Sequence, residues 1–130
     1  MIIGIGADIL QVERLRRSLR RFGVGYLEEM FTPDEIAMPQ ATSDVATHFS
    51  LGFCAKEACA KALGTGIDVD VDWYNIQIDY RTPSPRLMLS GGARTRLDVL
   101  TSAGSVAVPQ LSLSVAGGLA QAIVIIATAD

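Results

Sequence analysis

The segment from Gly52 to Ile67 places the strongest constraint on how this chain can fold. It begins with an alanine-rich run that also carries lysine and glutamate, residue types with high helix propensity. Gly64 and Gly66 follow, and glycine readily adopts the left-handed conformation in which helices end. The segment therefore predicts the second half of a long central helix, which we place over residues 45–63, with a Gly-Thr-Gly loop at its C-terminus.

Polar side chains share one face of this predicted helix. Their spacing of three or four residues places them on one side: Ser50, Cys54, Glu57 and Lys61. A carboxylate one turn before an ammonium group, ahead of a glycine-rich loop, suits a cation and a phosphate bound together. The alternative is a solvated i, i+4 ion pair on an ordinary amphipathic helix. The segment alone leaves both interpretations open.

Residues 1–9 predict a strand with an unusual composition. Gly4 and Gly6 interrupt its apolar residues, and their missing side chains leave room for close packing or for a ligand. Asp8 follows within the same strand, and an acid among apolar residues requires a partner. That partner is either a hydrogen-bond donor of the protein or a metal ion.

Periodicity and turn residues predict the remaining elements. Helices are expected over residues 12–22 and 93–101, and a short helix begins at a capping box formed by Thr32 and Glu35. Strands are expected over residues 73–80, 86–90, 111–116 and 120–128. We find no repeat or linker, so residues 1–130 form a single predicted domain.

Composition narrows the functional classes. Apolar residues make up 49% of the chain and the mean hydropathy is +0.32, which favours self-association through an apolar surface. A net charge of −3 and a pI of about 5.0 argue against a general nucleic-acid binder. No apolar run reaches the roughly 18 residues of a membrane-spanning helix, and the first residues lack the charged region of a signal peptide. We therefore expect a cytoplasmic protein that binds neither nucleic acid nor membrane.

The cysteines and the single histidine offer no obvious chemistry. Cys54 and Cys59 are five positions apart on the predicted helix and point in different directions, so we expect no disulfide between them. With His48 as the only histidine, the chain lacks the ligands of a Cys/His metal site. We expect reduced cysteines in or near the core, and His48 at the surface or in a capping turn.

Positive charge is concentrated in the predicted helix over residues 12–22. This helix holds five of the chain's eleven basic residues: Arg14, Arg16, Arg17, Arg20 and Arg21. They form either a solubilising face or a docking patch for an acidic partner, which would steer association.

Together these segments resemble the holo-acyl-carrier-protein synthases, the small 4′-phosphopantetheinyl transferases. The resemblance extends over most of the chain and rests on four groups of residues. These are Gly4–Ile9 followed by Arg14; the Thr-x-x-Glu segment Phe31–Glu35; the signature Phe53–Ala58 with Lys61–Ile67; and Trp73–Ile76 followed by Pro85.

This resemblance implies an α+β fold in which a small antiparallel sheet packs on a long central helix. It also implies a homotrimer with active sites between subunits. The implied reaction transfers 4′-phosphopantetheine from coenzyme A to a serine of an apo acyl carrier protein, with Mg²⁺ as cofactor and adenosine 3′,5′-bisphosphate as the second product.

The resemblance also assigns roles to residues. Asp8 and Glu57 would hold Mg²⁺ against the coenzyme pyrophosphate, and Glu57 would accept the serine proton through water. Lys61 would neutralise charge on the phosphates and complete the catalytic set. Coenzyme contacts are expected from Lys56, Lys61, Gly64, Thr65 and Gly66, and carrier contacts from Arg14, Arg17 and Arg21.

Three positions depart from the family pattern. Val115 stands where the family usually has an active-site histidine, and a valine can neither donate a hydrogen bond nor move a proton. Gly52 replaces an arginine, and Ser84 replaces a basic turn residue. The alternative function is therefore a catalytically impaired homologue that binds the carrier or coenzyme A, or that performs other chemistry on a carrier-bound substrate.

Overall fold

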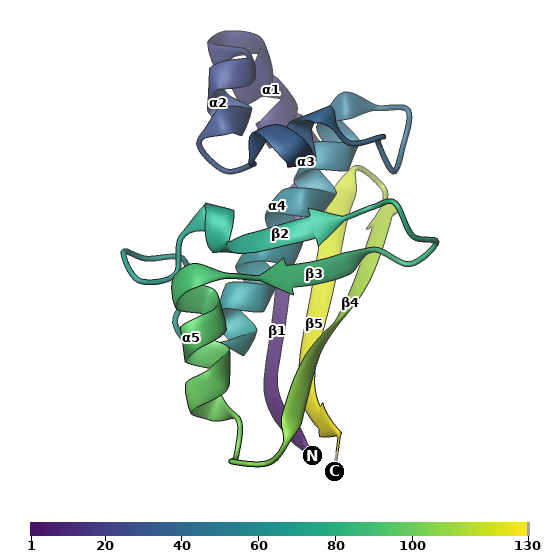
Figure 1. Ribbon diagram of the computed structural model, residues 1–130. Coiled ribbons are helices and arrows are strands. Elements are labelled where there is room, and N and C mark those ends of the chain that lie inside the picture. The colour runs from purple at the N-terminus through teal and green to yellow at the C-terminus, as the bar shows by residue number, and fades with distance from the viewer. Residues whose placement is uncertain (130) are drawn as a thin grey trace.

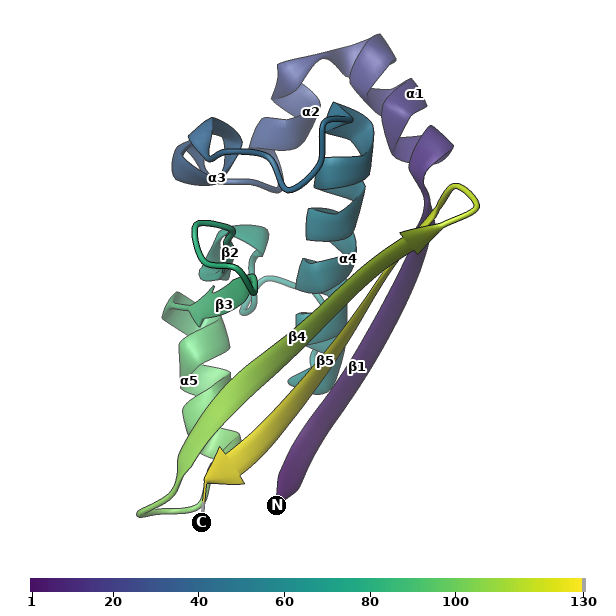
Figure 2. The ribbon, with the colours of Figure 1, turned by 90° about the vertical axis from the view of Figure 1, so that its right-hand side faces the viewer.

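A three-stranded antiparallel sheet and one long helix form the centre of the protein. The computed structural model describes residues 1–129. Strand β1 (Ile2–Gln11) pairs with β5 (Leu119–Ala129), which pairs in turn with β4 (Val106–Ala116), giving the order β1-β5-β4. Helix α4 (Val45–Ala62) crosses one face of this sheet (Figure 2). The predicted α+β architecture, with a small antiparallel sheet on a long central helix, is confirmed.

The remaining elements surround α4. Helices α1 (Val12–Phe22), α2 (Val24–Glu28) and α3 (Pro33–Ala37) lie around the N-terminal end of α4 (Figure 1). The hairpin of β2 (Ile76–Asp79) and β3 (Arg86–Leu89), the 3-10 turn η1 (Trp73–Asn75) and α5 (Gly91–Leu100) cover the side of α4 that faces away from the sheet. Helix α4 is therefore buried around most of its circumference, as its small alanine side chains permit.

Two glycines set the distance between β1 and α4. A Cβ atom added to Gly4 would lie 2.2 Å from the Ala62 carbonyl oxygen, and one added to Gly6 would lie 1.9 Å from the Ala58 carbonyl oxygen. Both distances are far below van der Waals contact, so only glycine allows the helix to approach this closely. The room that the sequence predicted at these glycines is used for packing, which brings α4 directly against the strand that carries Asp8.

Side-chain caps define where the helices begin. The Asp44 carboxylate accepts a hydrogen bond from the Thr47 backbone N–H and begins α4, and Thr32 and Glu35 form the predicted capping box of α3. His48 is buried rather than exposed, and its Nδ1 accepts a hydrogen bond from the Ala41 N–H at 2.9 Å. The expectation of a surface position for His48 is wrong, whereas its place beside the capping turn is as expected.

Two predicted strands begin elsewhere than expected. Trp73 lies in η1 and the strand starts at Ile76, because Asp72 and Asn75 close a capping box that forms a 3-10 turn. Strand β4 begins at Val106 and includes Pro109, since β4 is an edge strand and a proline there need not donate to a neighbour.

The face of the sheet opposite α4 carries no helix in the described part of the chain (Figure 2). Apolar side chains that are at least 38% exposed lie on the sheet, among them Ile5, Ile9, Val108 and Ile123. Cross-strand pairing places Ile5 opposite Ile125 and Ala7 opposite Ile123, so these residues form one continuous apolar surface. No helix among residues 1–129 is long and apolar enough to cross a membrane.

Candidate functional site

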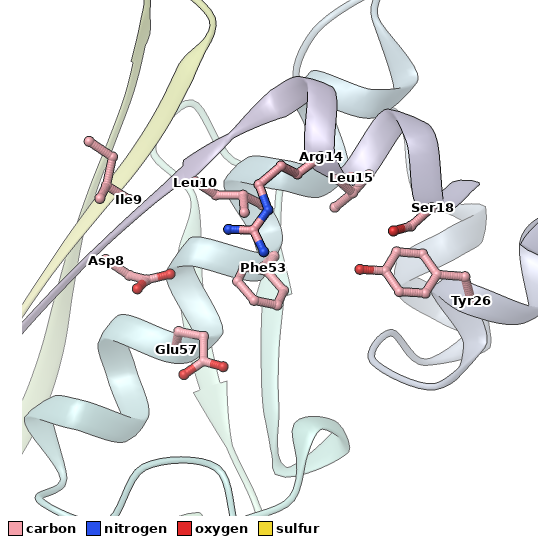
Figure 3. A pocket seen from close by; sticks show the side chains of 9 residues that line it. All are labelled: Asp8, Ile9, Leu10, Arg14, Leu15, Ser18, Tyr26, Phe53 and Glu57. Carbon is pink, nitrogen blue, oxygen red and sulfur yellow. The ribbon is translucent and has the colours of Figure 1, made fainter. Parts of the chain in front are cut away.

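A pocket of about 410 Å³ opens at the free edge of β1, between that strand, α1, α2 and α4. Figure 3 shows the residues that line it: Asp8, Ile9, Leu10, Arg14, Leu15, Ser18, Tyr26, Phe53 and Glu57. The carboxylates of Asp8 and Glu57 lie on the same side of the pocket, while Ser18 and Tyr26 lie at its other end. The structure therefore brings together the two acids that the sequence singled out.

The close approach of α4 to β1 also places Lys61 beside Asp8. The Lys61 Nζ lies 3.0 Å from Asp8 Oδ1 and 3.1 Å from the Ala7 carbonyl oxygen. The Lys61 side chain is 50% exposed, whereas that of Asp8 is 16% exposed. Asp8 thus has a cationic partner, and half of the Lys61 side-chain surface remains accessible to a ligand.

Glu57 lies in an environment that favours its protonated form. Burial raises the pKa of its carboxyl, the Asp8 carboxylate raises it further, and Lys61 acts in the opposite direction. Such a group is a stronger base than an exposed glutamate when it is ionised, which suits it to accept a proton. A cation shared with Asp8 would reverse the shift by favouring both carboxylates in their charged form.

The carboxylates of the pocket are the type of ligand that a magnesium ion requires. Mg²⁺ is usually held by one or two protein carboxylates, with water and substrate phosphate oxygens completing its octahedron. Asp8 and Glu57 supply two such carboxylates. No group of three or more His, Cys, Asp or Glu side chains able to hold a metal occurs among residues 1–129. The pair therefore fits Mg²⁺ bound together with a phosphorylated substrate, and it does not form an all-protein metal cage.

The cysteine next to this pair is not a nucleophile. The Cys54 thiol is fully buried, and its Sγ lies 3.6 Å from the Ala120 carbonyl oxygen. Burial, together with the neighbouring Asp8, raises the pKa of Cys54 to about 12. Burial likewise raises the pKa of Cys59 to about 12. Both side chains remain thiols at neutral pH, and both belong to the core as predicted.

The structure does not place Lys56 where the expected coenzyme contact requires it. Its side chain is 0% exposed, and its Nζ donates to Glu35 Oε1 at 2.7 Å, the Met30 carbonyl oxygen at 2.8 Å and the Trp73 carbonyl oxygen at 3.0 Å. The other Glu35 oxygen accepts from the Ile78 N–H. Lys56 therefore joins α4 to three other segments and cannot reach a surface ligand without leaving them.

The Gly-Thr-Gly loop ends α4 in the predicted way. Gly64 and Gly66 have φ values of +79° and +69°. The N–H groups of Thr65 and Gly66 both donate to the Ala60 carbonyl oxygen, and the Arg96 guanidinium donates to the Leu63 carbonyl oxygen at 2.9 Å. These loop N–H groups serve the helix terminus and are not free for a phosphate. Arg96, a cation beside the loop, was missed by the sequence analysis because only the tertiary fold brings α5 there.

The arginines of α1 divide between two faces of that helix. Arg16 and Arg20 pair with acids, whereas three others have no acidic partner among residues 1–129: Arg14, Arg17 and Arg21. Arg14 points into the pocket (Figure 3), and the Arg21 guanidinium lies 5.2 Å from the centre of the Phe22 ring. The three unpaired arginines are the ones that the resemblance assigns to an acidic partner.

Two of the departures from the family pattern lie away from the pocket. Val115 lies on β4 opposite Ala120, so β5 separates it from the strand that carries Asp8. Gly52 faces the interior, where an added Cβ would lie 2.7 Å from the Phe31 ring and 3.3 Å from the Tyr80 hydroxyl. Aromatic side chains occupy the space next to position 52, and a larger residue does not fit there.

Fold and pocket together define a small α+β protein that has the donor set for a divalent cation and a phosphate. The sequence pattern of the 4′-phosphopantetheinyl transferase superfamily matches residues 4–109. This match spans most of the chain, and the chain belongs to that family. The resemblance found in the sequence is thereby confirmed.

Curated relatives agree over nearly the full length. The chain is 42% identical over 127 residues to a holo-[acyl-carrier-protein] synthase of Methylobacterium sp. (strain 4-46), with 97% of this chain and 94% of the relative covered. A holo-[acyl-carrier-protein] synthase of Cereibacter sphaeroides is 39% identical over 127 residues, with 97% and 93% covered.

Solved structures of the same enzyme share the fold. The holo-[acyl-carrier-protein] synthase of Neisseria meningitidis superposes with a TM-score of 0.83 at 30% identity, covering 98% of this chain and 99% of that one. The Helicobacter pylori enzyme in complex with coenzyme A gives a TM-score of 0.77 at 29% identity, covering 95% and 99%.

Proposed function

We propose that this protein transfers 4′-phosphopantetheine from coenzyme A to a serine of an apo acyl carrier protein and releases adenosine 3′,5′-bisphosphate. The single observation that supports this most strongly is the pocket in which Asp8 of β1 and Glu57 of α4 lie together beside Lys61. The relatives named above carry this activity in their names, and one of them binds coenzyme A.

Asp8 and Glu57 are the proposed ligands of Mg²⁺. When bound, this ion would supply charge neutralisation at the coenzyme pyrophosphate. Burial raises the pKa of Glu57, and repulsion from the neighbouring Asp8 carboxylate raises it further. The acids are therefore held by the packing of α4 on β1 in an arrangement that favours a cation.

Glu57 and Lys61 have distinct proposed roles in the transfer. The serine oxygen attacks the phosphorus that carries the pantetheine arm, and the pyrophosphate P–O bond to adenosine bisphosphate breaks. Glu57 takes the serine proton through a water molecule, and Lys61 stabilises negative charge on the phosphate oxygens. The 50% exposed Lys61 side chain can exchange its contact with Asp8 for one with phosphate.

The unpaired arginines of α1 are the proposed contacts for the carrier protein. Arg14, Arg17 and Arg21 lie at positions i, i+3 and i+7, so they share one side of the helix. Acyl carrier proteins are acidic, and an exposed cationic face steers such a partner towards the pocket that Arg14 lines.

We further propose that three copies assemble through the uncovered face of the sheet. The apolar side chains on this face, including Ile5 and Ile123, would lose contact with water in a trimer. The pocket opens at the free edge of β1, so a neighbouring copy that covers the sheet can also reach the pocket.

A transfer assay tests the proposed function. The protein is incubated with coenzyme A, Mg²⁺ and a panel of apo carrier proteins, and the carriers are weighed by mass spectrometry. We expect one carrier to gain the phosphopantetheine mass. Glu57→Gln should slow the gain at least about 10²-fold. The control Asp98→Asn removes a charge from the exposed Arg94–Asp98 pair and should leave the rate unchanged.

The alternative is a binding module that no longer transfers, and the hydrophobic Val115 is the observation that favours it. In that case a labelled apo carrier binds while its mass stays unchanged and no adenosine bisphosphate forms. Val115→His is the second variant to assay. Position 115 lies away from the pocket within one chain, so a gain in rate would require a neighbouring copy of the proposed trimer to bring it there. Unchanged carrier mass with every carrier would refute the transferase.

A further inference from the structure

One carboxylate connects the arginine-rich helix to the helix that carries Glu57. The Arg16 guanidinium donates from NH1 to Asp44 Oδ1 and from NH2 to Asp44 Oδ2, both at 2.9 Å. The same Asp44 accepts from the Thr47 N–H at 3.3 Å and from the Thr47 hydroxyl at 2.6 Å, and so caps α4. Asp44 therefore fixes the start of α4 and holds α1 at the same time.

The two-pronged contact restricts α1 more than a single hydrogen bond would. A planar guanidinium that meets both carboxylate oxygens fixes direction as well as distance. Arg16 Nε also donates to Glu13 Oε2 at 3.0 Å, which orients the guanidinium from its other side. The Arg16 hydrogen bonds are the main cause that lowers the pKa of Asp44, so the pair remains ionised at neutral pH.

Apolar packing holds α1 mainly through its first half, and Leu19 further along is only partly buried against the core. Its buried apolar residues, Val12 and Leu15, both lie in its first half, and Phe22 at its end is 61% exposed. Arg16 lies at the middle of the helix and only two positions after Arg14, which points into the pocket. Rotation of α1 about its axis would carry Arg14 away from the pocket, and the Arg16–Asp44 contact opposes that rotation.

We propose that Arg16 and Asp44 are positioning residues for carrier docking. They hold α1 so that Arg14, Arg17 and Arg21 face the partner at a fixed place relative to Glu57, while Arg16 itself makes no contact with the carrier. This inference rests on the proposed function. It gives Arg16 a role other than the two that the sequence left open for the arginines of this helix, a solubilising face or a docking patch.

The contribution of this pair to overall stability is small. The two side chains are 31% and 42% exposed, and ion pairs of this kind add little to the free energy of unfolding. Loss of the pair should therefore appear in carrier recognition and not in folding. This separates a positioning role from a merely structural one.

Three variants test the proposal: Asp44→Asn, Arg16→Gln and the double variant. Asparagine retains an acceptor for the cap of α4 but loses the ionic contact with Arg16. We measure KM for the carrier, KM for coenzyme A, kcat, and the Kd of a fluorescently labelled apo carrier. Asp44→Asn should raise the carrier KM and Kd about 3- to 10-fold, with kcat and the coenzyme KM within about 2-fold of the unmodified protein.

The double variant tests whether Arg16 and Asp44 act together, and the controls test for an effect of net charge. If the two residues act as one unit, the double variant should be no weaker than either single variant. The controls Asp98→Asn and Arg94→Gln make the same charge changes in an exposed ion pair of α5. They should leave carrier binding unchanged, which excludes an effect of net charge alone.

The outcomes distinguish the competing roles. A lower carrier KM in Asp44→Asn would mean that a released Arg16 binds the carrier directly, which overturns the proposal. Unchanged KM and Kd would show that the pair is only structural and would also overturn it. If the unmodified protein binds the carrier without transferring to it, the transferase fails while the Kd series still decides the positioning role. If it binds no carrier, both proposals fail.

Discussion

Substitution of Gly6 by alanine tests how strongly the site depends on the approach of α4 to β1. The added Cβ would lie 1.9 Å from the Ala58 carbonyl oxygen and 2.7 Å from the Ala62 nitrogen. An ordinary contact begins near 3.4 Å, so strand and helix must separate by about 1.5 Å. The obstructing atoms belong to the backbone on both sides and cannot rotate away. Overpacking typically costs about 1–3 kcal/mol, and we expect the upper end of that range, about 3 kcal/mol.

The same separation would move Glu57 and Lys61 away from Asp8. A displacement of about 1 Å at reacting groups can reduce a rate about 10²-fold. Urea denaturation followed by circular dichroism gives the free energy of unfolding, and the carrier mass assay gives the rate. Both are measured at one protein concentration because the proposed assembly would stabilise the fold.

Gly25→Ala is the matched control. Gly25 lies in α2, has no atom within 4 Å of an added Cβ and has no positive φ, so alanine should stabilise the protein by about 0.5–1 kcal/mol. The same chemical change thus has opposite expected signs at the two glycines. Equal urea midpoints for Gly6→Ala and the unmodified protein, with an unchanged transfer rate, would refute the packing argument.

The remaining predictions concern Lys56, Glu57 and the uncovered face of the sheet. Lys56→Met should lower the free energy of unfolding by about 3–5 kcal/mol in urea titrations, because it leaves the buried Glu35 carboxylate without its cation; a loss below about 1 kcal/mol would contradict this role. Since burial and Asp8 raise the pKa of Glu57 in the metal-free protein, its carboxyl should titrate by NMR with a midpoint above the ordinary 4.5, and added Mg²⁺ should lower that midpoint. The folded state holds the Glu57 proton more tightly than the unfolded chain does, so the unmodified metal-free protein loses free energy of unfolding as pH rises from 4.5 through the raised pKa. Glu57→Gln lacks this titration, so its free energy of unfolding relative to the unmodified protein should increase over the same pH interval. Ile123→Asp on the uncovered sheet face should reduce the mass measured by light scattering to that of one chain, whereas Val99→Asp on α5 should not; an unchanged mass for Ile123→Asp would exclude this face as the interface.

Much of the site could be predicted because its signals are local in sequence. The helical period alone places Glu57 and Lys61 on one face of α4. The three-residue spacing of Thr32 and Glu35 is that of a capping box and predicts the start of α3. The glycines of β1 predicted either close packing or a ligand, and the structure shows packing. Each of these inferences needed only the neighbouring residues.

The missed features depend on contacts between distant segments. Lys56 is adjacent to Glu57, yet the Lys56 side chain is buried against Glu35 whereas Glu57 lines the pocket. Which side of α4 is buried depends on the elements that pack on it, and these are distant in sequence. Arg16 could not be separated from the other arginines of α1 before Asp44, 28 positions later, was placed beside it. Arg96 likewise reaches Leu63 only through the packing of α5 against the end of α4.

No loop separates the first strand from the first helix. Strand β1 ends at Gln11, α1 begins at Val12, and the Val12 N–H donates to the Gly118 carbonyl oxygen in the opposite turn. Asp8 and Arg14 therefore lie six residues apart on two directly joined elements. The hydrogen bond of the Val12 N–H fixes the junction between them. If the carrier docks on α1 as proposed, a displacement of this helix would also displace the strand that carries Asp8. Substitutions at Arg17 or Arg21 would change the proposed carrier contact without displacing Asp8.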